Sequence, residues 1–322
     1  MIKPNLIIAG VNKAASTSLF MYLSAHPEIC PSKVKETHYY LPLRYRDREL
    51  PPFAEYLEQF SHCDGAKYVL EATPGYFYGG RTLAQGIKDT LGDVRIIISF
   101  REPISRMFSF FKFRKSMLEL DPKLTFDEYI ALCENLPFTE CVKRENNAFW
   151  GIEGGFYSKY LNDWFNVFGR ENIQIVFFEH FVEDPKSVLR ELCIWLGIEY
   201  EKYLHDLDVT IENQTRNYKS RLLQDIALKV NWRWEHFWRT HPELKRNLRS
   251  IYYAINGANN QDRISDKSYA HLESIFRPYN RQLARELYEA GYRHLPEWLN
   301  KELQESIIPD CVNSVQTDPT GV

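Results

Sequence analysis

Short hydrophobic runs alternate with stretches of helical periodicity through the first two-thirds of the chain. The runs are continuous and are bounded by Gly, Pro or charged residues, which is typical of strands buried on both faces. They predict four strands, over residues 6–9, 68–71, 94–100 and 173–178. Helical patterns follow at 17–25 and 188–196, and Pro103 stands where a helix would begin after the third run. The pattern therefore predicts an α/β fold with a central parallel sheet flanked by helices.

The pattern changes after about residue 210. Residues 222–230 and 268–289 are helical in pattern, and residues 229–255 mix Trp and Phe with many basic residues. The aromatic and basic stretch is open to three interpretations: a lid over a binding site, a dimer surface, or a helix lying on a membrane. Its acidic residues and central His-Pro pair argue against the membrane helix, and we favour the lid. We predict a core at 1–210, a helical C-terminal part of the same domain at 211–302, and a loose polar tail at 303–322.

A loop with anion-binding character follows the first predicted strand. It spans Gly10–Ser18, between a strand and a helix, where backbone N–H groups and the positive end of the helix dipole meet. Lys13 adds a full charge, and Thr17 and Ser18 add hydroxyl donors. A nucleoside triphosphatase loop needs GxxxxGK[ST], but Ala15–Ser16 stand at its Gly-Lys positions. We therefore expect a phosphate or sulfate site without a dedicated Mg²⁺ ligand, with an ordinary capped turn as the structural alternative.

A second candidate anion site begins where the third strand ends. Arg101 closes that strand, and Ser109 lies eight residues on, about two helical turns into the next element. A guanidinium offers a planar fork to phosphate oxygens, and a serine offers a hydroxyl. Ligands of parallel sheets bind beyond the carboxyl ends of the strands, so the loops after Ala9, Glu71 and Phe100 are expected to converge on one site.

Composition narrows the function classes. The 40 basic and 43 acidic residues give a net charge of −3, which excludes a strongly basic nucleic-acid-binding protein. No run approaches the roughly 18 apolar residues that span a bilayer, and the N-terminus lacks the shape of a signal peptide. The six cysteines are scattered without a CxxC pair, so neither a zinc site nor a disulfide framework is indicated. We expect a reduced, cytoplasmic protein whose cysteines are mostly small core residues.

Taken together, these motifs resemble the sulfotransferases that use 3′-phosphoadenosine 5′-phosphosulfate (PAPS). The first loop is similar to their 5′-phosphosulfate loop, and the segment from Arg101 to Ser109 is similar to their 3′-phosphate motif. Residues 35–40 (KETHYY) resemble the segment that carries the catalytic Glu in heparan-sulfate-type members, and residues 71–77 resemble their substrate-side turn. Further matches follow in order at 155–157, 179–185 and 272–283, the last being similar to the C-terminal helix of bacterial relatives. The resemblance covers roughly residues 5–300.

The resemblance implies the P-loop-like sulfotransferase fold, PAPS as donor, PAP as product and no required metal. It implies Glu36 as the general base, with His38 as its rival because both would point to one side of an extended segment. Lys13 would stabilise charge on the leaving phosphate oxygen. The residues expected at the donor are Lys13, Ala14, Ala15, Ser16, Thr17 and Ser18 at the 5′ end, Arg101 and Ser109 at the 3′-phosphate, and Arg216, Lys219 and Arg221 on a closing basic loop. A plain surface charge run is the alternative for the last three.

The acceptor is the least constrained part of this prediction. Ala72 stands where glycan-modifying members carry a basic residue, and Ala14–Ala15 replace the usual Gly-Gly or Gly-Ser pair. We expect sulfuryl transfer from PAPS to a hydroxyl or amine of a small-molecule natural product in secondary metabolism, uncharged or cationic given the net charge. The alternatives are a saccharide or glycan sulfotransferase, an ATP-dependent small-molecule kinase, and a nucleotide-binding protein without turnover. A homo-oligomer is compatible with the sequence, whereas neither nucleic acid binding nor stable membrane insertion is expected.

Overall fold

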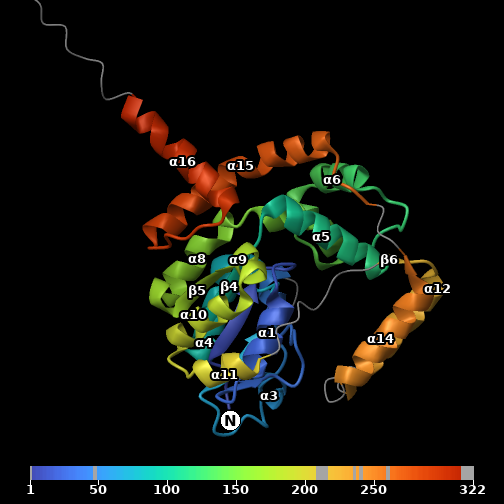
Figure 1. The fold of residues 1–322 in the computed structure, drawn as a ribbon, viewed down its shortest axis with the longest axis vertical. Helices are drawn as coiled ribbons and strands as arrows, with labels where there is room; N and C mark the ends of the chain where they lie inside the picture. Colours follow the sequence, from blue (N-terminus) through green and yellow to red (C-terminus); the bar gives the residue numbers. More distant parts are fainter. Residues whose placement is uncertain are drawn as a thin grey trace, which may run out of the picture.

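The computed structural model describes residues 2–45, 49–207, 217–234, 237–238, 242–258 and 262–312. At its centre lies a five-stranded, fully parallel sheet with the strand order β2-β3-β1-β4-β5 (Figure 1). The strands are β1 (Leu6–Gly10), β2 (Ile29–Pro31), β3 (Tyr68–Ala72), β4 (Arg95–Phe100) and β5 (Ile173–Phe177). The α/β class and the four predicted strands are confirmed, to within one residue at each end. The sequence pattern does not predict β2, because three residues ending in Pro carry little periodic signal.

The rest of the described chain is mainly helical. The α-helices are α1 (Ser16–Ser24), α2 (Leu41–Tyr45), α3 (Phe53–Glu58), α4 (Gly80–Leu91), α5 (Pro103–Ser116), α6 (Phe126–Asn135), α7 (Phe138–Cys141), α8 (Ser158–Phe168), α9 (Phe178–Glu183), α10 (Pro185–Leu196), α11 (Glu201–Asp206), α12 (Arg221–Arg233), α14 (Pro242–Asn256), α15 (Asp266–Glu289) and α16 (Glu297–Val312). Short 3₁₀ turns are η1 (Phe77–Gly79), η2 (Arg144–Phe149), η3 (Glu153–Gly155) and η4 (Arg170–Asn172), and a small antiparallel pair joins β6 (Asn217–Tyr218) to β7 (Gly257–Ala258).

Helices cover both faces of the central sheet, because its strands alternate buried side chains between the two faces. Ile7 and Ile96 belong to the core that α4 and α8 close. Ile8 and Ile97 belong to the opposite core, which α1 and α10 close. This two-sided cover leaves the loops beyond the strand ends, rather than a sheet face, to carry a binding site.

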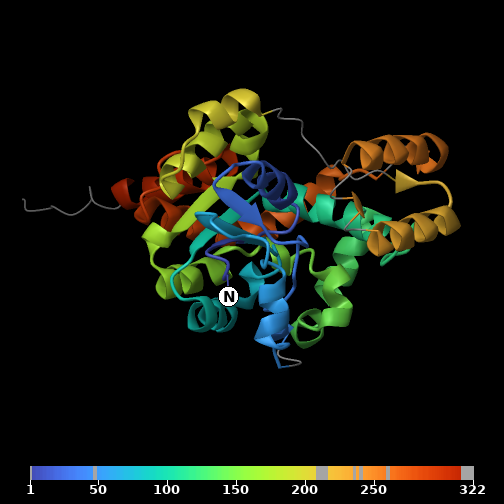
Figure 2. The same ribbon diagram turned by 90° about the horizontal axis from the view of Figure 1, so that it is seen from below.

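Helix α5 links the sheet to the C-terminal part of the chain. It begins at Pro103, and the Glu102 side chain caps its first turn, so the predicted start is confirmed. At its far end, Gln224 of α12 donates a hydrogen bond to the Ser116 carbonyl at 2.6 Å, and Tyr252 of α14 bonds to Gln224 in turn. Figures 1 and 2 place α12 and α14 at the periphery of the molecule, beyond this end of α5. The lid function of this segment stays a prediction.

The C-terminal helix continues into the segment for which a loose tail was expected. Helix α16 runs to Val312, and residues 313–322 lie outside the described part. Its anchor is Glu302, which is 3% exposed and pairs with Arg277 and Arg281 of α15 at 3.6 and 3.1 Å. Polar residues that look solvated in the sequence are therefore engaged between two helices. Over the described ranges, none of the helices combines the length and apolarity needed to cross a bilayer.

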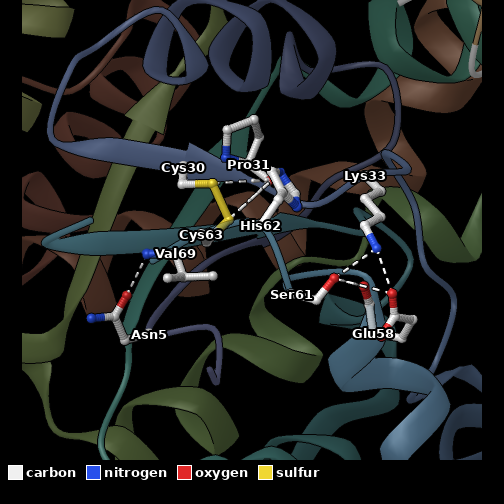
Figure 3. The surroundings of a disulfide bond; sticks show 9 residues. All are labelled: Asn5, Cys30, Pro31, Lys33, Glu58, Ser61, His62, Cys63 and Val69. Atoms are coloured by element: carbon white, nitrogen blue, oxygen red, sulfur yellow. Dashed lines mark hydrogen bonds and ion pairs between the residues drawn. A yellow bond between two sulfur atoms is a disulfide. The ribbon is translucent and has the colours of Figure 1, made fainter. Parts of the chain in front are cut away.

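The expectation that the cysteines form no disulfide is wrong. Cys30 of β2 and Cys63, which follows α3, form a disulfide with an S–S distance of 2.02 Å (Figure 3). The two lie 33 residues apart, and they meet because the chain returns past α3 to the edge of the sheet. His62 reaches within 4.8 Å of both sulfurs, a metal-ligand arrangement, but both sulfurs are used by the disulfide. The cysteine argument for a reducing compartment therefore loses its basis.

Candidate active site

The loop after β1 forms an open helix N-terminus. Gly10 ends β1 where a Cβ would lie 2.5 Å from the Cβ of Phe77, so no other residue fits without displacement. The loop then turns through positive φ angles at Lys13 (71°) and Ala15 (66°), conformations that are strained outside glycine and cluster at functional sites. The N-cap residue of α1 is Ala15, which has no side chain that could cap the helix, so the first backbone N–H groups, at Ser16 and onwards, can bind an anion.

The side chain of Lys13 lies over this loop among other charged groups. Its Nζ is 4.4 Å from the centre of the Phe113 ring of α5. Burial, aided by the Arg101 guanidinium, lowers the pKa of Lys13 to about 8, while the Glu36 carboxylate acts in the opposite direction. The structure thus brings Arg101 and Glu36 within electrostatic reach of Lys13. A partly desolvated cation of this kind is suited to an anionic ligand.

Arg101 leaves β4 and bonds back to the first loop. Its Nη1 donates to the Lys13 carbonyl at 3.2 Å, and its guanidinium lies 4.1 Å from the centre of the Phe178 ring. Its Nε is buried and has no hydrogen-bond partner within the described ranges. Burial lowers the pKa of Arg101, and the Glu179 carboxylate partly offsets this. An unpaired buried guanidinium N–H is a donor site that an oxyanion would satisfy.

Lys112 is a cation at this site that the sequence reasoning does not single out. It lies three residues after Ser109 on α5, and therefore on the same face of the helix. Burial, followed by the Arg101 charge, lowers the pKa of Lys112. The spacing of Ser109 and Lys112 in the sequence is the signal that would have identified it.

Glu36 and His38 lie together, but not on an extended strand as expected. Both have positive φ angles, 65° and 60°, so the segment turns at each of them. The Glu36 N–H donates to the Ala72 carbonyl at 2.9 Å, which ties the segment to the end of β3. The Glu36 carboxylate accepts from Lys35 Nζ at 2.5 Å and lies 3.3 Å from His38 Nε2. The two candidate bases are therefore in direct contact.

The charge state of Glu36 follows from these neighbours. Burial by itself would raise the pKa of Glu36, but the Lys35 ammonium and the hydrogen bonds from His38 and Lys35 outweigh it and lower that pKa to about 2. The side chain remains 39% exposed, so a ligand can reach it. The group is therefore an ionised carboxylate at neutral pH.

A buried carboxylate at the end of β3 supports this segment. Glu71 is fully buried within an otherwise apolar strand, which is the signal in the sequence that marks it. Its oxygens accept hydrogen bonds from four hydroxyls: Thr37 at 2.5 Å, Tyr76 at 2.7 Å, Thr73 at 3.0 Å, and Tyr56. Because Thr37 stands between Glu36 and His38, this network fixes the position of both candidate bases.

Only part of the predicted closing loop is described. Arg216 lies outside the described residues. Lys219 is exposed and its backbone N–H bonds to the Asn256 carbonyl, and Arg221 is exposed at the start of α12. Both lie with β6 and α12 near the C-terminal end of α5. Within the described residues, neither contacts Lys13 or Arg101. Their donor-binding role stays a prediction.

Comparison with known proteins identifies the relatives of this chain. Residues 81–239 match the sulfotransferase domain family. A membrane-associated sulfotransferase, kil1, of Dictyostelium discoideum is 32% identical over 110 residues, 34% of this chain and 23% of that protein. Human heparan sulfate glucosamine 3-O-sulfotransferase 3B1 is 24% identical over 258 residues, 79% of this chain and 61% of that protein. The chain thus spans less than two thirds of the length of either relative.

A solved structure supports the fold. The crystal structure of a sulfotransferase from Alicyclobacillus acidocaldarius superposes with a TM-score of 0.66 at 21% identity, covering 92% of this chain and 99% of that chain. The predicted fold and the resemblance to sulfotransferases are therefore confirmed.

Proposed function

Starting from the match to the sulfotransferase domain, we propose that this chain transfers the sulfuryl group of PAPS to a hydroxyl of a small-molecule acceptor, with Glu36 as general base. One observation carries the proposal. Lys13 stands in the loop before the N-terminus of α1, and its ammonium interacts electrostatically with both the Arg101 guanidinium and the Glu36 carboxylate. A transfer needs these three kinds of group close together: donors for the anionic donor molecule, a cation for the leaving group and a base.

The donor would be held at its two anionic ends. Residues 13–18, Lys13, Ala14, Ala15, Ser16, Thr17 and Ser18, would hold the 5′-phosphosulfate through backbone N–H groups, hydroxyls and one cation. Arg101, Ser109 and Lys112 would hold the 3′-phosphate. We propose that no metal ion is needed, because these cations can take the place of Mg²⁺ in neutralising the donor.

The reaction is an in-line displacement at sulfur. The acceptor oxygen forms a bond to sulfur as the bond from sulfur to the bridging phosphate oxygen breaks, and PAP leaves. Lys13 stabilises the charge that develops on the bridging oxygen, and the acceptor proton passes to Glu36. The low pKa of free Glu36 rests on neighbouring cations. An anionic donor would engage such cations, and this would raise the pKa of Glu36 and make it a better base in the complex.

A saccharide acceptor is the second candidate. It is supported by the name of the human relative, which acts on heparan sulfate glucosamine. An ATP-dependent kinase is less well supported, because Ala15–Ser16 replace the Gly-Lys pair of the nucleotide loop.

The donor is tested by thermal stabilisation with PAP in EDTA, compared with ATP and Mg²⁺. We expect PAP alone to raise the melting temperature. Stabilisation by ATP and Mg²⁺ but not by PAP would contradict the proposal. Incubation with PAPS and a metabolite extract, followed by a search for products heavier by one SO₃, then identifies the acceptor.

The base is tested with Glu36→Gln and, as a matched variant, His38→Gln. We expect Glu36→Gln to lower kcat by about 10²–10⁴-fold and to leave PAP affinity nearly unchanged, since the group acts on the acceptor proton. An unchanged rate in Glu36→Gln with a large loss in His38→Gln would assign the base to His38 instead.

A further inference from the structure

A pocket of about 390 Å³ lies beside α2 and the turn that follows β3. Its lining includes Arg44, Tyr45, Tyr78, Trp150 and Tyr160, so its walls are largely aromatic. This volume is suited to one or two rings rather than to an extended chain, and flat walls favour flat ligands.

Arg44 is a half-buried cation at this pocket, and within the described ranges it has no anionic partner. Its guanidinium carbon lies 4.6 Å from the ring centre of Trp150, 4.9 Å from Tyr45 and 5.0 Å from Tyr78. Its nitrogens make two long hydrogen bonds, to the carbonyl of Gly75 at 3.4 Å and to Asn147 Oδ1 at 3.5 Å. Throughout the described ranges no carboxylate lies within ion-pair distance of it. Burial lowers the pKa of Arg44.

Two other charged side chains of the pocket are already engaged. Lys159 pairs with Glu153 at 3.1 Å. Asp163 accepts a hydrogen bond from the backbone N–H of Arg81 at 3.0 Å. Arg81 itself is an exposed residue of the lining, so water solvates its charge. Among the lining residues, Arg44 is therefore the one that a bound anion would stabilise most. A desolvated guanidinium is stabilised by a partner that accepts hydrogen bonds from both of its terminal N–H groups.

A short stretch of backbone links the pocket to the segment that carries the candidate base. The Glu36 N–H bonds to the Ala72 carbonyl, and the Gly75 carbonyl bonds to Arg44. Gly75 lies three positions after Ala72, so their Cα atoms are at most about 11 Å apart. A ring compound could therefore present a hydroxyl to Glu36 while its opposite end meets Arg44.

We propose that this pocket selects the acceptor, which is a ring compound with a carboxylate at the end opposite to its reacting hydroxyl, and that Arg44 is the specificity residue that binds the carboxylate. The inference rests on the proposed sulfotransferase function. It also revises the expectation of an uncharged or cationic acceptor, because the net charge of a chain does not fix the charge of one pocket. The acceptor O–H would become O–SO₃⁻, and the carboxylate would be unchanged.

The test measures binding to the PAP-saturated protein, so that it does not depend on turnover. The probes are 4-hydroxybenzoate, 4-hydroxyphenylacetate and 4-hydroxycinnamate, each paired with its methyl ester, and 4-hydroxybenzenesulfonate as a tetrahedral anion. The variants are Arg44→Met, which keeps an unbranched apolar stem, and Lys143→Met as the matched control. Lys143 is an exposed cation after α7 that pairs with Glu140 and does not line the pocket.

We expect at least one acid to bind about tenfold more tightly than its ester, and this preference to fall below about twofold in Arg44→Met but to persist in Lys143→Met. PAP affinity should be the same in all three proteins, which also shows that the variants are folded. Equal binding of acids and esters, or no binding of any probe, overturns the inference about the acceptor. If PAP still binds in that case, the proposed function is not contradicted. Tighter binding of the sulfonate than of the acids overturns the choice of carboxylate. Failure of PAP itself to bind contradicts the proposed function instead.

Discussion

The pKa of Lys13 makes nucleotide affinity depend on pH in a defined way. In the free protein, burial and the Arg101 charge lower this pKa to about 8. The charged form is the one that binds a phosphate, so a bound nucleotide raises the pKa again. Well below pH 8, Lys13 is fully charged and should give the nucleotide affinity no pH dependence. The nucleotide affinity should fall as the pH rises through 8.

The magnitude follows from the fraction of Lys13 that is charged. With a pKa of about 8, that fraction falls about eightfold between about pH 7.5 and about pH 9. If the bound nucleotide restores the ordinary value of 10.5, the full coupling is about 2.5 pKa units, or on the order of 3 kcal/mol. Phosphate groups lose their second proton near pH 6, so the ligand contributes no slope in this range.

The assay is a titration of PAP by calorimetry from about pH 7.5 to about pH 9.5 at constant ionic strength. Lys13→Arg is the control, because a guanidinium stays charged throughout and should remove the slope. A flat profile for the natural protein would refute the reasoning. So would a slope retained in Lys13→Arg, which would assign the titration to another group such as Lys112.

Three further outcomes are expected. Ser109→Ala should weaken PAP binding about tenfold, because one charge-assisted hydrogen bond to the 3′-phosphate is lost. The affinity for adenosine 5′-phosphosulfate, measured by the same titration, should be unchanged. Equal losses of affinity for both nucleotides would show that the Ser109 hydroxyl does not bind the 3′-phosphate. Replacing Cys30 and Cys63 together by Ala should lower the free energy of unfolding in urea by about 3–4 kcal/mol, given their separation of 33 residues, and make it insensitive to dithiothreitol; a variant as stable as the oxidised protein would contradict this. Glu71→Gln should lower stability in urea by about 2–4 kcal/mol and reduce kcat while PAP affinity holds, because an NH2 donor replaces one of the two accepting oxygens and the remaining oxygen is neutral; intact stability and rate would show that the network is dispensable.

Much of the donor half of the site could be predicted from the sequence. A continuous apolar run followed by a loop and a helix start fixes where the first N–H groups point, and the structure has Lys13 in that loop. Arg101 could be predicted in the same way, because Pro103 marks the beginning of the next helix. These inferences succeed because strand ends and helix starts are local properties of a few neighbouring residues.

The acceptor half depends on contacts between distant residues. Glu36 and His38 come into contact because the backbone turns at both residues with a positive φ. Glu and His are not residue types that predict this conformation. Arg44 owes its character to rings that arrive from η1 and from Trp150, more than 100 residues later in the case of Trp150. The disulfide likewise pairs residues that only the return of the chain past α3 brings together. The hydrophobic periodicity of one segment does not predict which distant residues will contact it.

The disulfide between Cys30 and Cys63 closes the residues between them into a covalent circle, that is, a loop whose two ends are bonded to each other. Glu36, His38 and Arg44 all belong to that circle, whereas Lys13 and Arg101 lie outside it. The side chains proposed to face the acceptor therefore lie on one covalently closed segment, whose two ends meet at the edge of the sheet, and those proposed to hold the donor lie outside it. Under the proposed function, substitutions within this segment should change acceptor binding and leave nucleotide binding intact.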